Sequence, residues 1–441
     1  MLRLVWFLPL SIACVRTLPD ASVTVDTEVV TRALVQLDAG EEITAHVTYG
    51  DADADEALWL STPEQTGSAL AFTVYLHAGL ESAFRVEGVD ANGREVTGPL
   101  QTVTAGSLPS GVPVFDTTID VTVADLGPWL LTTGMSASPE DTAVVITTTD
   151  GRTVWYWQPG DAVIPSARFD PATGTIYGTA FDLLNEGYGY LFNLPVAGGD
   201  LVTHPLTWAH HDAVLLSDGT LTTCVSAFAE FEGESIAGDT LVEVAPDGTE
   251  RTIWSAFDHL TPTVNIGWTI SQFPNGEPDW THCNGIDYDE DQGAYYVSLW
   301  GPEQVVKIDR ATGDTVWFLG GPENQFDFGD DPGFGPQHAP EFHGGRLHLF
   351  DNRDGEGSRA VAYALDEAAM TATLDWSFEP ADPQWALVLG DVSERADGSH
   401  LMSWGSGGDI FVTDANEQLS GFLRMDKALA VGQVSEIGEM P

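Results

Sequence analysis

The sequence predicts an all-β protein, a six-bladed β-propeller preceded by a small immunoglobulin- or fibronectin-like β-sandwich. Three observations lead to this prediction. Short alternating strands fill the first hundred residues, a strand–turn–strand phrase then recurs roughly every 50 residues, and no segment shows a helical hydrophobic period of useful length. The 46 glycines and 25 prolines agree with it, because both residues favour turn-rich β folds.

Residues 20–106 are expected to form the sandwich. Several short segments there alternate apolar and polar residues and are separated by Gly, Asp and Asn turns, which is typical of immunoglobulin-like domains. These segments are Ser22–Asp26, Ile43–Val47, Leu70–Tyr75 and Ser82–Val86. Gly106–Pro113, rich in Gly, Ser and Pro, then follows as a linker.

Residues 114–441 are expected to form the propeller. The repeated phrase is an apolar strand, a turn with Asp or Gly, and a second strand that often carries tryptophan. Its copies begin near Val144, Tyr190, Val242, Val305, Ala360 and Ile410, 46 to 63 residues apart. Six such copies predict six blades around a central channel. Two stacked β-sandwiches, the alternative, would explain the repetition less well.

The composition is strongly acidic, because 67 Asp and Glu residues outnumber 16 Lys and Arg residues and give a net charge of −51 over 441 residues. A surface of this sign repels phosphate backbones and anionic lipid headgroups, so nucleic-acid binding is excluded as a function. The acid excess itself indicates solubility, or a salty or extracellular medium, rather than a site. The acidic runs Asp51–Glu56 and Asp327–Asp331 are expected to be solvated turns, because the first lacks the glycine and distal glutamate of a calcium loop.

The N-terminus predicts export. One basic residue and a short apolar run precede Leu10–Cys14, and the run is too short to cross ~30 Å of hydrocarbon. We expect residues 1–13 to be a lipoprotein-type signal peptide and Cys14 to carry lipid, which places the protein in the periplasm, the outer membrane or the cell surface. Ser11 stands where such signals usually have leucine, so cleavage by the ordinary secretory peptidase is the alternative. Cys224 and Cys283 could pair or remain thiols, since spacing alone does not decide.

Three histidine positions recur at matching places in successive repeats. They are His210–Asp212, His282–Asn284 and His338, separated by 56 to 72 residues. Equivalent positions on successive blades face one mouth of the channel, so these imidazoles are expected to converge. Such a trio fits either a zinc site or nucleophilic transfer assisted by neighbouring imidazoles. The other histidines are expected to be structural: His46, His77, His204, His259, His343, His348 and His400.

The segments around these histidines resemble the motifs of bacterial arylsulfate sulfotransferases, in the same order. The matching segments are Trp208–Gly219, Trp280–Asp289, Gly313–Gly321, Gln337–Ala339 and Leu347–Asn352. The resemblance, over about Trp155–Phe422, implies a periplasmic six-bladed propeller with a small N-terminal β domain. It also implies transfer of a sulfuryl group from a phenyl sulfate to a phenol through a sulfohistidine, with no nucleotide donor, cofactor or metal.

Carried over to this sequence, the resemblance assigns the nucleophile to His338. It assigns the polar pair of a second motif to His282 and Asn284, and the histidine of the first motif to His211 or its neighbour His210. A neutral imidazole is a competent nucleophile at sulfur, and the sulfuryl oxygens need fixed donors around them.

Two departures from the family motifs affect this assignment. Val297–Trp300 stands where family members have an arginine that fixes the sulfate, and Ala339 replaces the acid often found after the nucleophile. Arg346, Arg353 and Arg395 are the candidate replacements. Without a guanidinium the developing charge loses a bidentate partner. The alternative function is therefore a catalytically inactive propeller lipoprotein that serves as a binding or surface scaffold.

Overall fold

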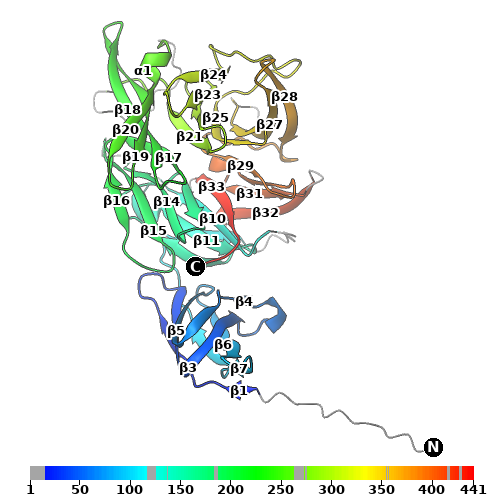
Figure 1. Ribbon diagram of the computed structural model, residues 1–441. Helices are drawn as coiled ribbons and strands as arrows, with labels where there is room; N and C mark the ends of the chain where they lie inside the picture. Colours follow the sequence, from blue (N-terminus) through cyan, green and yellow to red (C-terminus); the bar gives the residue numbers. More distant parts are fainter. Residues whose placement is uncertain are drawn as a thin grey trace, which may run out of the picture. The chain divides into compact units, whose positions relative to one another are not determined.

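The computed structural model describes residues 15–116, 126–136, 138–182, 187–262, 273, 276–353, 355, 357–414, 418–426 and 430–441. The chain divides into two compact units, residues 1–108 with Pro441, and residues 109–440 (Figure 1). The expected signal peptide and Cys14 lie outside the described residues. In the described ranges, no helix is long and apolar enough to cross a membrane.

The first unit holds eight described strands in one hydrogen-bonded network. They are β1 (Arg16–Thr17), β2 (Ser22–Val25), β3 (Arg32–Asp51), β4 (Leu60–Ser61), β5 (Gln65–Tyr75), β6 (Glu81–Asp90), β7 (Glu95–Thr97) and β8 (Gln101–Thr104), with a 3₁₀ turn at Glu56–Leu58. The long strand β3 pairs with β2 and β5 along its first half and with β6 along its second. Alternate residues of β3 are buried against Phe72 and Phe84, as a period of two requires. The immunoglobulin- or fibronectin-like sandwich stays a prediction.

The second unit is a six-bladed β-propeller, which confirms the main prediction from the sequence repeat. Blade 1 is β33 (Ala430–Ile437), β10 (Trp129–Met135), β11 (Ala143–Thr148) and β12 (Thr153–Trp157), and blade 2 is β13 (Ala167–Asp170), β14 (Thr175–Phe181), β15 (Gly189–Pro195) and β16 (Val202–Pro205). Blade 3 is β17 (Ala209–Leu215), β18 (Leu221–Phe231), β19 (Glu234–Val244) and β20 (Glu250–Ser255), followed by the short helix α1 (Ala256–His259).

The remaining three blades continue around the ring. Blade 4 is β21 (Cys283–Asp289), β22 (Ala294–Leu299), β23 (Gln304–Asp309) and β24 (Thr315–Gly320), and blade 5 is β25 (Gln337–His343), β26 (Arg346–Asp351), β27 (Arg359–Asp366) and β28 (Thr371–Phe378). Blade 6 is β29 (Asp391–Glu394), β30 (His400–Ser403), β31 (Asp409–Thr413), β32 (Leu419–Asp426) and the early strand β9 (Val114–Asp116). Two further 3₁₀ turns cover Pro139–Asp141 and Gly405–Gly407.

The repeated phrase corresponds to the third and fourth strands of each blade. Its six predicted starting points fall in or next to β11, β15, β19, β23, β27 and β31. Four tryptophans of the phrase, Trp155, Trp254, Trp317 and Trp376, are buried, and the indole N–H groups of the first two find acceptors on the next blade. Trp155 of β12 donates to the carbonyl of Val196 at 3.2 Å, and Trp254 of β20 donates to Thr315 of β24 at 2.9 Å.

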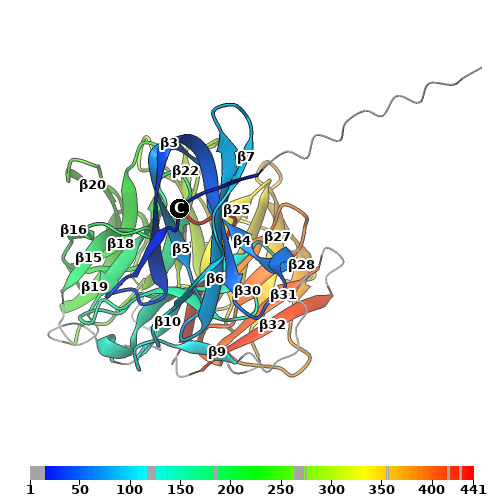
Figure 2. The ribbon, with the colours of Figure 1, turned by 90° about the horizontal axis from the view of Figure 1, so that it is seen from below.

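The first strands of the six blades contact one another in a closed ring around the channel: β33, β13, β17, β21, β25 and β29. Both ends of this unit help to close the ring. The last strand, β33, pairs with β10 and completes blade 1 (Figure 1). The early strand β9 pairs with β32 and completes blade 6 (Figure 2). The candidate histidines lie at or directly before the start of first strands, so the ring positions the candidate site.

Candidate functional site

A β-bulge interrupts each of the three first strands that carry the candidate histidines. The register shifts within His210–Ala213 on β17, Cys283–Gly285 on β21 and His338–Glu341 on β25. One residue at or beside each bulge has a positive φ: His211 (61°), His282 (47°) and Ala339 (48°). A bulge redirects side chains, and a non-glycine residue in this region stores strain of roughly 1–3 kcal/mol. The same strained device, repeated on three neighbouring blades, is typical of a functional site.

Three imidazoles gather at the start of β17 and β21. The Nδ1 atoms of His210 and His211 lie 2.7 Å apart, and the ring centroids of His211 and His282 are 4.7 Å apart. These rings line a pocket of about 40 Å³ that aromatic residues also border. Its aromatic lining is Phe181, Tyr188, Trp208 and Phe273. The pocket therefore presents nitrogen atoms to a small polar group, with apolar rings that suit an aromatic one.

A hydrogen-bonded chain sets the tautomer of His211. Burial by itself would raise the pKa of Asp239, but His210, Thr281 and the backbone of Cys283 lower it below the usual value, so this side chain is an anion. Asp239 accepts from Nε2 of His210 at 2.9 Å, so the tautomer of His210 that carries its proton on Nε2 has its lone pair on Nδ1 and accepts there from Nδ1 of His211. The free lone pair of His211 is then on Nε2. Burial, with the neighbouring His282, lowers the pKa of His211 well below its usual value, so this ring is neutral.

His282 has the opposite electrostatic character. Its Nδ1 donates to Oδ2 of Asp279 at 2.6 Å, and its backbone N–H also bonds the same carboxylate at 3.2 Å. Burial by itself would lower the pKa of His282, but the carboxylates of Asp279 and Asp239 outweigh it and raise this pKa above the usual 6.5. His282 is therefore the imidazole of the pocket best suited to hold a proton on Nε2.

His338 is buried next to this group and is held at both ring nitrogens. Nδ1 lies 2.7 Å from Oδ1 of Asn352, whose own N–H₂ group donates to the carbonyls of Ala386 and Leu389. Because the amide orientation is fixed in this way, Nδ1 of His338 carries the proton and Nε2 carries the lone pair. Nε2 accepts from the backbone N–H of Leu389 at 3.2 Å. Burial lowers the pKa of His338 to about 3, and the charge of His282 contributes to this.

Asn284 acts across the junction of blades 4 and 5. Its Nδ2 donates to the carbonyl of Gln337, directly before His338, at 2.7 Å. Within the described residues its Oδ1 is buried without a hydrogen-bond partner. The structure therefore brings His210, His211 and His282 into one pocket, with His338 close enough to affect the pKa of His211. Asn284 is tied to the strand that carries His338.

The candidate arginines are bound to carboxylates. Arg346 pairs with Glu394 at 2.6 Å, Arg353 with Glu379 at 3.1 Å and Arg395 with Glu436 at 2.7 Å. Trp300, in the segment that departs from the family motif, lies with its ring centroid 6.0 Å from that of His282. In the part of the chain that the structure describes, no guanidinium lines the histidine pocket, and the indole of Trp300 lies beside the imidazole of His282.

The acid of the first histidine motif, Asp212, is buried and does not line the histidine pocket. It binds Arg168 at 2.8 Å and accepts from the hydroxyl of Ser166 at 2.7 Å and the backbone N–H of Ile286 at 3.1 Å. Because it ties together strands of blades 2, 3 and 4, its role is structural. The positive φ of His211 separates the direction of this carboxylate from that of the adjacent imidazole.

A disulfide joins Cys224 of β18 to Cys283 of β21, with their Cα atoms 6.2 Å apart. This decides the alternative that the sequence left open. Cys224 pairs across the strands with His210, and Cys283 directly follows His282. The disulfide therefore links blades 3 and 4 directly behind two of the pocket histidines.

The residues that orient the imidazoles were missed by the sequence analysis. Asp239 lies 29 residues after His210 in the same blade, and it reaches the start of β21 only because blades 3 and 4 pack together. Asp279 lies three residues before His282, and this spacing was the one local signal for it. Asn352 belongs to a segment that resembles a family motif, but nothing in the sequence linked it to His338.

Comparison with known proteins identifies one matching family. A family model described as Arylsulfotransferase (ASST) matches residues 182–420, more than half of the chain. No curated protein matches. A solved protein of unknown function from Bacteroides caccae is 13% identical, with a TM-score of 0.48 over 71% of this chain and 100% of that one. A periplasmic gluconolactonase from Pseudomonas aeruginosa is 12% identical, with a TM-score of 0.43 over 90% and 100%. Likeness at this level does not bear on activity.

Proposed function

The chain belongs to the arylsulfotransferase family, and we propose that it transfers a sulfuryl group from an aryl sulfate to a phenolic acceptor through a sulfohistidine. The observation that carries this proposal is the contrast among the imidazoles. His338 and His211 are neutral with defined lone pairs, whereas His282 has a raised pKa. Group transfer needs both kinds, a nucleophile and a proton donor.

In the first half-reaction, the lone pair on Nε2 of His338 attacks sulfur. The Nε2–S bond forms while the bond from sulfur to the aryl oxygen breaks, and the phenolate takes the proton from Nε2 of His282. The attack must replace the 3.2 Å hydrogen bond from Leu389, which is long for a backbone donor. The sulfated ring then carries a positive charge, which the Oδ1 atom of Asn352 stabilises through Nδ1–H.

In the second half-reaction, the acceptor phenol gives its proton to the neutral His282, and its oxygen attacks sulfur. The Nε2–S bond breaks, and the electron pair returns to His338. His211, whose Nε2 lone pair is free, would hold an ordered water beside the acceptor. Trp208 and Phe273 offer apolar faces for the aryl ring.

The test uses the full-length mature protein with 4-nitrophenyl sulfate as donor and phenol as acceptor. We expect release of nitrophenolate, formation of phenyl sulfate, and a mass increase of one sulfuryl group on the peptide that contains His338. His338→Ala should abolish both labelling and transfer. His282→Ala and His211→Ala should each slow transfer by ~10²- to 10⁴-fold. His204→Ala, at a partly exposed histidine outside the pocket, is the matched control and should leave the rate unchanged.

A second candidate function is a binding or surface scaffold that takes up aryl sulfates without transferring them. It is favoured by the pocket lining, in which, over the described residues, His282 and not an arginine is the potential cation. In this case calorimetry would detect binding of 4-nitrophenyl sulfate, while neither nitrophenolate nor labelled enzyme would form. That result would overturn transfer through His338.

We further propose that the protein is exported and anchored through lipid on Cys14. The disulfide between Cys224 and Cys283 supports export, because disulfides persist in oxidising compartments and are rare in the cytosol. An anchored chain would act on small phenolic compounds outside the cytoplasm.

A further inference from the structure

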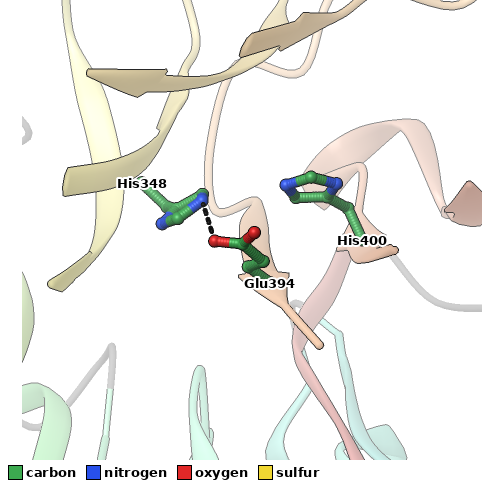
Figure 3. A group of neighbouring side chains, drawn as sticks. All are labelled: His348, Glu394 and His400. Carbon is green, nitrogen blue, oxygen red and sulfur yellow. Dashed lines mark ion pairs between the residues drawn. The ribbon is translucent and has the colours of Figure 1, made fainter. Parts of the chain in front are cut away.

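A second group of ionisable side chains lies between blades 5 and 6, and one of its members, His348, pairs across the strands with Glu341 of β25. It consists of His348 on β26, Glu394 at the end of β29 and His400 at the start of β30. Figure 3 shows the carboxylate of Glu394 between the two imidazole rings. One ligand atom from each of the three residues lies within 4.8 Å of the others.

Both histidines of this cluster are buried, and their ring nitrogens are poorly satisfied by hydrogen bonds. Their exposed fractions are 0% for His348 and 2% for His400, and within the described residues none of the four ring nitrogens makes a hydrogen bond of normal geometry. A buried polar group without a partner costs roughly 1–3 kcal/mol. Buried imidazoles are usually satisfied, so this pair indicates a missing electrophilic partner rather than ordinary core packing.

The carboxylate between them is already oriented as a ligand. Arg346 donates to Oε1 of Glu394 at 2.6 Å, while Oε2 lies 3.3 Å from Nε2 of His348. Two donor atoms of a zinc tetrahedron with bonds of ~2.0–2.1 Å lie about 3.3–3.5 Å apart, so this edge already has the length that the metal requires. Arg346 thus plays the part of an outer partner that fixes a metal-binding carboxylate.

The orientation of His400 and the charge around Glu394 also suit a bound cation. The ring of His400 stacks on Trp376, with centroids 3.7 Å apart and an interplanar angle of 10°, so its plane is fixed. Arg346 carries one positive charge, and its ion-pair partners Glu394 and Asp375 carry two negative charges, which leaves a net charge of −1 to receive a cation. The side chain of Glu394 is 17% exposed, which leaves room for a water molecule to reach the cluster.

We propose that His348, Glu394 and His400 form a zinc site, in which the two imidazoles and Oε2 of the carboxylate bind Zn²⁺ and a water molecule occupies the fourth position. Two histidines, one glutamate and a water are a known zinc ligand set. Nitrogen ligands disfavour Ca²⁺ and Mg²⁺, which prefer oxygen. The site does not use the imidazoles proposed for sulfuryl transfer, so it stands or falls independently of that activity.

The experiment begins with the full-length protein, treated with a chelator and then dialysed against Zn²⁺ or Co²⁺, with Ca²⁺ and Mg²⁺ as negative controls. We expect one tightly bound Zn²⁺ per chain and, with Co²⁺, the visible absorption of a four-coordinate ion. His400→Ala should weaken binding by ~100-fold or more, because loss of a ligand exceeds the ~10- to 100-fold effect of an outer partner. His343→Ala, at an exposed histidine of neighbouring β25, should bind zinc normally.

Crystals of the wild-type protein soaked in Zn²⁺ give a test that does not depend on a stable variant. An anomalous peak within bonding distance of His348, Glu394 and His400 would support the site. A peak only at His210, His211 and His282, or no bound zinc at all, would overturn it. Unchanged affinity in a folded His400→Ala protein would also overturn it.

Discussion

The raised pKa of His282 depends on Asp279, so Asp279→Asn is the sharpest perturbation of the pocket. The substitution keeps the shape and an acceptor oxygen near Nδ1 but removes the charge that lies 2.6 Å from the imidazole. A hydrogen bond to a charged group contributes ~1.5–3 kcal/mol, and one pKa unit corresponds to about 1.4 kcal/mol. The pKa of His282 should therefore fall by about 1 to 2 units.

The assay is the pH dependence of kcat/KM for transfer from 4-nitrophenyl sulfate to phenol. The proposed proton donor is active only while His282 is protonated, so activity should fall as pH rises through its pKa. In Asp279→Asn this alkaline limb should move down by about 1 to 2 units, while the maximum rate at lower pH stays within ~10-fold of wild type. Glu250→Gln, which removes an exposed carboxylate 2.9 Å from His204, should leave the profile unchanged.

The free energy of unfolding gives a second readout of the raised pKa of His282, and it too should fall as pH rises. A group whose pKa is raised in the folded state contributes stability below its unfolded pKa, here about 6.5, and this contribution is lost as pH rises through the folded value. The wild-type protein should therefore lose this contribution between pH 6.5 and the raised pKa, and Asp279→Asn should not. If the alkaline limb and the stability difference are both the same in the two proteins, Asp279 does not set the protonation of His282.

Three further outcomes are expected. Reducing the disulfide, or replacing both Cys224 and Cys283 by Ser, should lower the free energy of unfolding by about 4 kcal/mol, because the crosslink spans 59 residues. Urea unfolding that is unaffected by reductant would contradict this. Gly432→Ala should destabilise the protein by ~1–3 kcal/mol, since a Cβ there would overlap a side chain of β10, whereas Gly438→Ala meets nothing and should be neutral in thermal unfolding. Mass spectrometry of the mature N-terminus should find lipid on Cys14, and an unmodified peptide starting beyond it would remove the anchor.

The ring of blades could be predicted because each blade repeats local information. Turn residues and period-two strands are properties of neighbouring residues, so even the degenerate copy at Tyr190 marks the third strand of blade 2. The meeting of His211 with His282 follows from the same logic, since equivalent positions on adjacent blades must be neighbours. The catalytic role of these residues, and of His338, stays a prediction.

The orientation of the side chains could not be predicted, because it depends on contacts between blades. Asp239 contacts Cys283 at a sequence separation of 44, and Leu389 contacts His338 at a separation of 51. His348 and His400 were expected to be ordinary structural residues, because only the packing of blade 5 on blade 6 brings them to one carboxylate. No pattern along the chain encodes such a meeting.

Because β33 completes blade 1, the propeller cannot close until this late strand has been synthesised. During synthesis from the N-terminus, blades 2 to 5 emerge as complete sheets, but blade 1 lacks its channel-lining strand until β33 has been made. Until then β10 presents an unpaired edge that could join with another chain. A chain without β33 would therefore leave the ring of first strands open between β29 and β13. Pairing of β33 with β10 is therefore the step that covers this edge.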